Sequence, residues 1–361
     1  MKLKNILPGI LLMMSVFPAS AQQTKILTAE KHNEYGLIYT LPITALNVEV
    51  TAEKEVRKAG PYYQYAKKYM GTDNVVKDDA EVWTIKSVKV RPYGIPDPDA
   101  RYLMQLKPGS VTYIGVDADG MLLSINKSPE PVAEPAPEPE RQDGEQIGDN
   151  EYLQYMDEDF IASQSSAKQA QMLAENLMDI RDAKISLTRG TAETMPTDGK
   201  QLELMLNSLA HQEATLTAAF LGNITRETVV KNYTIVPAEN GKKTLFRLSN
   251  FAGFVGADDY SGSPVYVSVN ITNEGTLPVD SKGEEKKLPK DAVAYCVPGA
   301  AEIEISFQGN TLWAEEVELA QFGVVFGLNP SVFTDKKEPS YAVFDPATGA
   351  LKELGTVREE E

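Results

Sequence analysis

The chain has 361 residues, more than one typical domain holds, and carries a formal net charge of −17 with two histidines and one cysteine. Its acidic surface, which has no basic stripe, repels phosphate backbones and excludes nucleic acid as a partner. Two histidines and one cysteine are also too few ligands for zinc sites of the usual composition, so we predict no metal and no cofactor.

The first 21 residues have the pattern of a secretory signal peptide. Two lysines precede an apolar run from Ile6 to Phe17, and small residues lead to Ala21, where we expect cleavage. A membrane-spanning helix needs about 20 apolar residues, so neither this run nor any later segment is long enough. Gln22 follows the cleavage site, where a bacterial lipid anchor would require cysteine. We therefore predict that residues 1–21 direct export.

Residues 22–127 predict a β-rich domain with one short helix. In YGLIYTLPITALNVEV the apolar positions change parity near Pro42, which predicts a bulge or a bend in a long strand. The segment Val82–Val90 shows a similar change. Further along, Asp119 and Gly120 predict a hairpin turn. The motif DADG also opens some calcium loops, but the glutamate required at the twelfth position is missing, so the turn is favoured.

Four tyrosines fall within GPYYQYAKKYMG, Gly60–Gly71. They form either a stacking platform for a sugar or base, or one apolar face of a short helix. On a helix, one face would hold Tyr62, Tyr65, Ala66 and Tyr69. We favour packing of that face in a core, because a short exposed helix would have little left to bury. Tyr63 lies on another face and, with Trp83, is the candidate for ligand binding.

Residues 128–150 predict a charged spacer. Five prolines fall between Pro129 and Pro139, and they alternate with glutamate and alanine. Proline favours extended polyproline II and like charges repel one another, so we expect a semi-rigid, solvated connection. The alternative, a ligand for a proline-binding module, is disfavoured because the stretch lacks a basic or aromatic anchor.

Residues 151–222 predict an α-helical hairpin. The first helix begins near Ser163 and carries apolar residues at helical spacing: Ala170, Leu173, Ala174, Leu177 and Ile180. After a polar loop, Asp198 and Gln201 fit a capping box at the start of a second helix. The apolar stripe of the second helix comprises Leu202, Met205, Leu206, Leu209, Leu216 and Phe220. Gly222 then ends that helix, and the two helices should pack antiparallel.

One carboxylate lies within the apolar stripe of the second helix. Glu213 falls inside that stripe on a helical wheel, so it needs a partner or its pKa should rise. Arg181 and Lys184 lie beside the stripe of the first helix and could reach it across the hairpin. We predict a structural ion pair that fixes the register, rather than a catalytic acid. His211 projects opposite the stripe and should be solvated.

Residues 223–361 return to strong alternation with frequent turns, which predicts a β sandwich or half-barrel. In FQGNTL, Gly309 and Asn310 predict a hairpin turn. The single cysteine, Cys296, has apolar neighbours and should be buried and inert. The predicted fold class is therefore α+β, with a β-rich N-terminal domain, an α-helical hairpin and a C-terminal sandwich-like domain.

Catalytic groups are scarce. The chain has no GxSxG elbow and no glycine-rich phosphate loop of the common patterns. Acidic neighbours typical of solvated surfaces occur at Asp97–Asp99, Asp157–Asp159, Asp258–Asp259 and Glu315–Glu316. A glycosidase needs two carboxylates about 5–10 Å apart in a cleft, which spacing along a chain does not show. We predict no catalytic residue.

Four stretches resemble domain-of-unknown-function family 4831, a family of uncharacterised exported proteins from Bacteroides-type bacteria. They are GPYYQYAKKYMG, DIRDAKISLTRGTAETMPTDGKQLELMLNSL, HQEATLTAAFLG and VPGAAEIEISFQGNTLWAEEVELAQFGVVFGLNPSVF. The resemblance covers nearly the whole chain after residue 21, with the spacer as a variable part. It implies a Gram-negative envelope protein, periplasmic or associated with the outer surface, and it carries no catalytic residues over.

These observations favour an exported, non-enzymatic envelope protein that binds a protein or a glycan. Export, β domains, an extended spacer and the shortage of catalytic side chains all indicate this function. The first alternative is a carboxylate-dependent glycan hydrolase, which requires two converging carboxylates in a cleft with aromatic walls. The second is a structural subunit of an envelope assembly, which requires a large exposed apolar patch.

Overall fold

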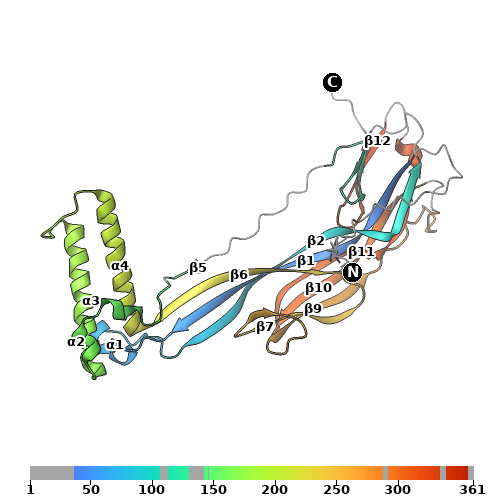
Figure 1. Ribbon diagram of the computed structural model, residues 1–361. Helices are drawn as coiled ribbons and strands as arrows, with labels where there is room; N and C mark the ends of the chain where they lie inside the picture. The colour runs from blue at the N-terminus through green and yellow to red at the C-terminus, as the bar shows by residue number, and fades with distance from the viewer. Residues whose placement is uncertain are drawn as a thin grey trace, which may run out of the picture.

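The computed structural model describes residues 36–105, 113–129, 142–144, 146–287, 292–333 and 339–356. The predicted signal peptide and most of the predicted spacer lie outside these residues. Strands predominate and helices are confined mainly to one unit, which confirms the predicted α+β class. The molecule is elongated: two long strands connect a helical unit at one end with a small sheet at the other (Figure 1).

A long antiparallel sheet forms the spine of the molecule, with the strand order β2-β1-β6-β5. Its strands are β1 Gly36–Lys58, β2 Ala80–Gln105, β5 Gln142–Asp143 and β6 Asn223–Ile235. The register between β1 and β2 shifts between Thr40 and Pro42 and again between Thr51 and Ala52. The second shift leaves Lys86 as an extra residue of β2. Both predicted changes of parity are therefore confirmed as irregularities in this strand pair.

A second sheet, the sandwich sheet, packs against one face of the long sheet. Its strand order is β11-β10-β9-β7-β8. Its strands are β7 Gly241–Ser249, β8 Gly253–Val255, β9 Ser263–Asn273, β10 Val293–Phe307 and β11 Asn310–Leu328. Buried side chains of both layers fill the core between them: Leu46, Val48, Val50, Phe246, Val265 and Ile303. One layer of the sandwich thus comes largely from residues that precede the spacer.

A third, small sheet lies at the opposite end from the helices, in the order β13-β12-β4-β3. Its strands are β3 Ile114–Val116, β4 Leu122–Ile125, β12 Ser340–Phe344 and β13 Leu351–Thr356, with the 3-10 turn Pro330–Phe333 nearby. Because β6 pairs with β1 and β12 pairs with β4, two of the three sheets combine strands from both sides of the spacer. The predicted boundaries at 128 and 223 do not separate the sheets.

The hairpin between β3 and β4 closes as predicted. Oδ1 of Asp117 accepts hydrogen bonds from the backbone N–H groups of Asp119 and Met121, at 3.0 and 2.8 Å. Gly120 takes a positive φ of 80°. The DADG motif is therefore a turn whose first aspartate is occupied by backbone donors.

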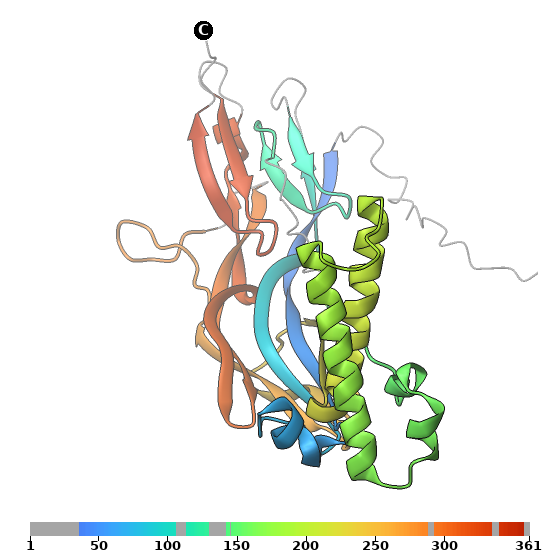
Figure 2. The same cartoon turned by 90° about the vertical axis from the view of Figure 1, so that its left-hand side faces the viewer.

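The helical unit stands at the other end of the long sheet. It contains the 3-10 turns Tyr63–Tyr65 and Glu151–Tyr155 and the helices α1 Ala66–Met70, α2 Glu158–Ala162, α3 Ser166–Arg189 and α4 Gly199–Leu221. Figure 2 shows α3 and α4 side by side and antiparallel, which confirms the predicted hairpin. Among the described residues, no helix has the length and apolarity that a bilayer crossing needs.

The core of the helical unit lies at its base, near the long sheet. The predicted stripe of α3 is buried there, and Tyr62 and Ala66 join it with exposures of 6% and 1%. This confirms that the tyrosine face packs in a core. On α4 only the C-terminal part of the stripe is buried, at Leu216 and Phe220, because the N-terminal part lies beyond this core. Asp198 precedes α4, but its side chain accepts no capping hydrogen bond, so the predicted capping box is wrong.

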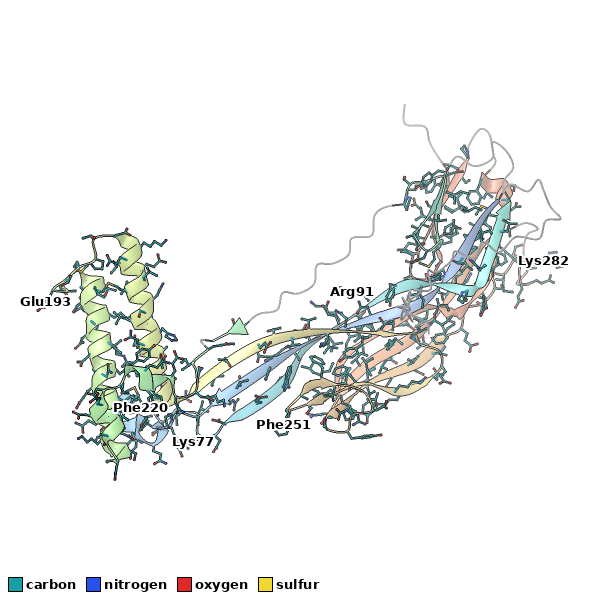
Figure 3. The ribbon with its side chains drawn as sticks, in the orientation of Figure 1. Lys77, Arg91, Glu193, Phe220, Phe251 and Lys282 are labelled. Carbon is teal, nitrogen blue, oxygen red and sulfur yellow. The ribbon has the colours of Figure 1, made fainter. Side chains whose placement is uncertain are left out.

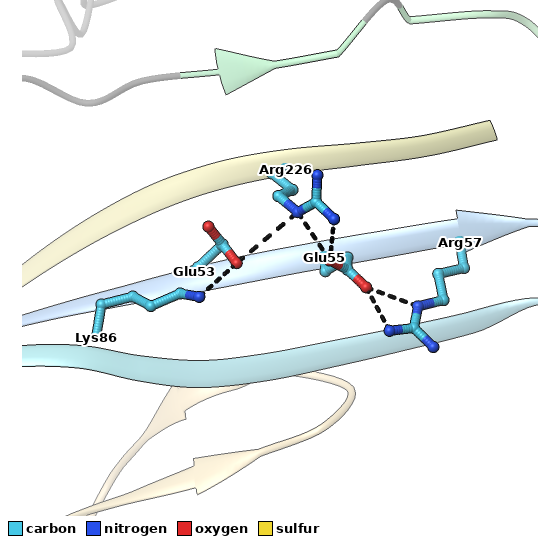
Figure 4. A network of polar contacts seen from close by, with 5 residues as sticks. All are labelled: Glu53, Glu55, Arg57, Lys86 and Arg226. Carbon is cyan, nitrogen blue, oxygen red and sulfur yellow. Dashed lines mark hydrogen bonds and ion pairs between the residues drawn. The ribbon is translucent and has the colours of Figure 1, made fainter.

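A network of charged side chains ties the three main strands of the long sheet together near the helical unit (Figure 4). Arg226 of β6 donates from Nε to Glu55 of β1 at 2.8 Å, and Arg57 donates from Nε to the same carboxylate at 2.6 Å. Lys86 of β2 lies 2.8 Å from Glu53. The hydrogen bond from Arg57 is the main cause that holds the pKa of Glu55 below its usual value.

The single cysteine is buried in β10. Cys296 is 4% exposed, and its Sγ lies 3.6 Å from the backbone oxygen of Ala320. Burial raises the pKa of this thiol to about 11. The predicted burial is confirmed, and the thiol is held in its protonated, unreactive form at neutral pH.

Candidate functional site

A hollow of about 410 Å³ opens at one end of the sandwich, where β2 passes the turns of the sandwich sheet. Its apolar wall consists of Trp83, Ile85, Leu248, Phe307 and Leu312. Its polar lining consists of Thr84, Asn250, Ser261, Ser263 and Gln308. Phe251 completes the lining and projects from the turn between β7 and β8 (Figure 3). We call this hollow the aromatic groove.

Two aromatic side chains face water here: Phe251, which lines the aromatic groove, and Tyr260, which precedes the lining residue Ser261 in the chain. Phe251 is 90% exposed and Tyr260 is 83% exposed. The guanidinium of Arg247 lies 4.4 Å from the ring centroid of Tyr260 and also donates to the backbone oxygens of Ala257 and Gly262, at 2.8 and 3.2 Å. These contacts fix the loop that carries Tyr260. When a ligand covers a large aromatic ring that was exposed to water, the burial of apolar surface contributes favourably to the free energy of binding.

Trp83, one of the two residues predicted to bind ligand, forms the inner wall of the aromatic groove. Its ring packs edge-to-face on Phe254, with centroids 6.1 Å apart. A Cβ on Gly253 would lie 2.6 Å from Cζ2 of Trp83, and Gly253 has a φ of +66°, so the turn needs glycine here. Nε1 of Trp83 is buried and has no hydrogen-bond partner among the described residues. Packing alone therefore joins this indole to the β7–β8 hairpin.

The described residues that line the aromatic groove include no charged side chain, although 24% of the chain is charged. The lining instead combines aromatic rings with side-chain amides and hydroxyls. A sugar presents apolar C–H faces that stack on aromatic rings and hydroxyls that exchange hydrogen bonds with amides. The pair of carboxylates that glycoside hydrolysis needs is not in this lining. The arrangement suits holding a neutral, polyhydroxylated ligand better than cleaving it.

The structure does not bring Tyr63 and Trp83 together. Tyr63 lies half-buried in the 3-10 turn at the base of the helical unit, and it lines no part of the aromatic groove. Trp83 lies on β2 and packs against the sandwich sheet. The two residues are near each other in sequence but not in space, because the chain leaves the helical unit after Tyr63 and enters the long strand β2 before Trp83. Of the two, only Trp83 belongs to this site.

The structure places Glu213 between the two basic residues of the facing helix. Arg181 donates from Nε to Oε1 of Glu213 at 2.8 Å, and Lys184 donates from Nζ to Oε2 at 3.0 Å. The hydrogen bond from Arg181 is the main cause that lowers the pKa of Glu213. These three side chains span α3 and α4 and line neither the aromatic groove nor another hollow described here. Their geometry is that of a structural ion pair.

A second hollow, of about 250 Å³, lies where the helical unit meets the long sheet. Its residue Glu151 lies 2.7 Å from Nε2 of His211 and accepts a hydrogen bond from the backbone of Gly148, which is the main cause that lowers its pKa. His211 is thus partly exposed, at 37%, as its place opposite the stripe predicts, but it also has a partner, because the turn Glu151–Tyr155 folds back against α4. Asp79 and Lys58, also in the lining, pair at 3.4 Å. These charged side chains pair with one another, so we interpret this hollow as part of the packing between the helical unit and the long sheet and not as a binding site.

None of the four acidic clusters found in the sequence lines the aromatic groove. Asp258–Asp259 comes nearest along the chain. Oδ1 of Asp259 accepts a hydrogen bond from the backbone of Ser261 at 2.9 Å, and this bond is the main cause that lowers its pKa. That carboxylate shapes the loop beside the groove and does not enter it.

The sequence pattern did not indicate Phe251, its fellow turn residue Tyr260 or Gln308. Phe251 and Tyr260 lie in the turns SNFAGF and DDYSG, whereas alternation of apolar and polar residues indicates strands only. An aromatic residue in the middle of a turn, where polar residues are usual, is the signal that could have found them. The hairpin at FQGNTL is confirmed, but its turn is Gln308-Gly309, one residue earlier than predicted.

One family profile, described as a domain of unknown function (DUF4831), matches residues 35–352. No curated protein matches the chain significantly, and no solved structure does either. The matched range runs from the start of β1 into β13 and includes the helical unit and the aromatic groove. Because this match covers most of the chain, the protein belongs to the DUF4831 family.

Proposed function

We propose that the protein is an exported, non-enzymatic binding protein of the cell envelope, and that its ligand is a neutral glycan. One observation carries the proposal: the aromatic groove has an uncharged lining of rings, amides and hydroxyls, with Phe251 exposed at its rim. The signal peptide predicted at residues 1–21 supports a site outside the cytoplasm. The family resemblance supports a Gram-negative envelope, either the periplasm or the outer surface.

Binding is favoured over hydrolysis at this groove. A glycoside hydrolase of the usual kind places two carboxylic acids on either side of the scissile bond. The polar groups of the described lining are amides and hydroxyls, and these groups neither protonate a leaving oxygen nor activate water at neutral pH. They do supply the directional hydrogen bonds that recognition of sugars needs.

A glycan screen tests the proposal directly. The chain from residue 22 onward is applied to an array of neutral and acidic glycans, and the affinity of each hit is measured by calorimetry. Phe251→Ala should lower that affinity at least about tenfold, equivalent to about 1.4 kcal/mol, without lowering the melting temperature. Tyr113→Ala removes another exposed aromatic ring, 43% exposed near β3, and serves as the control. Absence of any neutral glycan among the hits would overturn the proposal.

A second function, as a subunit of an envelope assembly, is favoured by one separate observation. The helical hairpin exposes apolar side chains at Met178, Ile185, Leu204 and Met205, with exposures of 44%, 43%, 63% and 39%. A partner helix could cover these side chains. Leu204→Glu should then prevent co-purification of a partner protein from envelope extracts. A wild-type chain that remains monomeric and recruits no envelope protein would exclude this function.

A further inference from the structure

A third hollow, of about 290 Å³, adjoins the aromatic groove. Ser263 and Gln308 line both. The third hollow lies on the outer face of the sandwich sheet, because in β9 the side chains of Val265 and Val267 point into the core while Tyr266 points outward between them. The two hollows therefore meet around the end of one sheet, one on each of its faces.

The third hollow, which we call the outer hollow, has its own aromatic ring with polar neighbours. Tyr266 pairs across the sheet with Thr244 of β7 and Ser306 of β10, and Ser306 is in the lining. Nζ of Lys242 lies 4.5 Å from the ring centroid of Tyr266. The carboxylate of Glu304 also lines the hollow. A ring flanked by a hydroxyl, an ammonium and a carboxylate offers one stacking face and both donors and acceptors to a second sugar.

Gln308 connects the two hollows. It occupies the tight turn between β10 and β11 with a φ of +50°, followed by Gly309 at +81°. Positive φ at both positions is the pattern of a turn in which asparagine or glycine is the usual first residue. A glutamine costs more conformational energy there than glycine does. Its longer amide side chain, however, borders both hollows, so a ligand that passes from one to the other crosses this side chain.

We propose that the aromatic groove and the outer hollow are adjacent subsites of one binding site, and that the ligand is an oligosaccharide chain that crosses the Gln308-Gly309 turn. This inference rests on the proposed function, because it assumes that the aromatic groove binds a glycan. One sugar lies against Phe251 and Trp83. A later sugar of the same chain lies over Tyr266, and the amide of Gln308 hydrogen-bonds the linkage between them.

Chain length is the variable that tests this arrangement. Calorimetry on the chain from residue 22 onward uses two series of β-1,4-linked probes of one to six units. One series consists of N-acetylglucosamine oligomers and the other of glucose oligomers. A third series consists of shortened versions of the best hit from the glycan array. The affinity of the wild type should rise at least about tenfold between the shortest bound oligomer and one that reaches both subsites. Tyr266→Ala should abolish that rise and leave the affinity for the shortest bound oligomer unchanged. Phe251→Ala should weaken every length.

Two further variants separate lost recognition from lost structure. Gln308→Gly removes the shared amide at a position where glycine relaxes the backbone, so its melting temperature should not fall while the gain with length shrinks. Tyr341→Ala is the matched control, because Tyr341 forms a similar pair with Lys127, at 4.8 Å, in the small sheet. It should bind every length as the wild type does.

The outcomes distinguish the two proposals. If the wild type binds glycans with an affinity independent of length, or if Tyr266→Ala retains the full gain, the two-subsite arrangement is overturned while glycan binding stands. If no oligomer of any length and no array glycan binds, the proposed function fails and this inference fails with it. A gain that disappears in Tyr266→Ala, shrinks in Gln308→Gly and persists in Tyr341→Ala supports the chain-like ligand.

Discussion

The side-chain amide of Gln321 pairs with the backbone of Thr44 in the manner of a neighbouring strand. The N–H of Thr44 donates to Oε1 of Gln321 at 3.1 Å, and Nε2 of Gln321 donates to the carbonyl of Thr44 at 3.1 Å. The hydroxyl of Thr44, which is fully buried, accepts from the N–H of Ala320 and donates to the carbonyl of Ala347. This pair joins β1, β11 and the β12–β13 turn where β1 leaves the sandwich for the small sheet.

Replacing Gln321 by leucine should therefore destabilise the protein. The substitution leaves the N–H and C=O of Thr44 without these partners in a poorly hydrated place, and each unmade hydrogen bond of this kind costs about 1–3 kcal/mol. Urea unfolding followed by circular dichroism measures the loss. Gln64→Leu, at an exposed position in the 3-10 turn Tyr63–Tyr65, is the control and should change the stability by less than about 0.5 kcal/mol. Equal midpoints for the two variants would contradict the role of Gln321.

The ion pair of Glu213 predicts a pH-dependent contribution to stability. Its pKa in the folded protein lies below the ordinary value of 4.5, so the contribution is fully present above that pH and is lost as the pH falls through the folded pKa. Glu213→Gln should cost about 0.5–1 kcal/mol at pH 7, because the partners are partly exposed, and progressively less as the pH falls through the folded pKa of Glu213. Denaturant melts at pH 7 and at a series of lower pH values measure the difference. Glu203→Gln, at an exposed position of α4, should show no such dependence.

Gly253→Ala should displace Trp83 from its packed position and so disturb the wall of the aromatic groove. The new Cβ would lie 2.6 Å from the indole at a φ of +66°, which disfavours any residue with a side chain, and we expect a loss of about 2–3 kcal/mol. Tryptophan fluorescence should shift because the ring moves. The double variant with Trp83→Leu should lose less than the two single losses added together, since the clash is then removed. Strict additivity would show that Trp83 does not meet this turn.

Cys296 should resist thiol reagents in the native protein. Its pKa of about 11 and its burial leave very little accessible thiolate at pH 8. Iodoacetamide at that pH should add no mass to the native chain and one label after unfolding in guanidinium chloride. Labelling of the folded protein on the timescale of the unfolded control would show that β10 opens readily.

Local features of this fold follow from the sequence because they depend on neighbours along the chain. The parity changes near Pro42 and around Lys86 mark where one strand turns its apolar residues to the other face, and the structure has register shifts at both places. The helical wheel likewise places Glu213 inside the stripe of α4, opposite the basic residues of α3. In both cases the period of the pattern carries the information.

The sequence did not predict in the same way which strands before the spacer pair with strands after it. Alternation shows that Val48 and Tyr233 each lie on a strand, but not that these two residues face each other, because pairing is decided by contacts between distant segments. The aromatic groove depends on such a pairing, since Trp83 and Phe251 meet only when the sandwich sheet packs on the long sheet. The partner of His211 was not predictable for the same reason, because Glu151 arrives from a separate turn.

The length of β1 has a mechanical consequence. At about 3.3 Å per residue, its 23 residues reach roughly 75 Å, and β2 runs beside it in the opposite direction over nearly the whole distance. A pull between the helical unit and the far end of the molecule would be carried in parallel by two extended backbones, because each strand spans the whole distance, and the hydrogen bonds between them would hold the strands in register. The spine can thus transmit tension between its two ends as a stiff tether does.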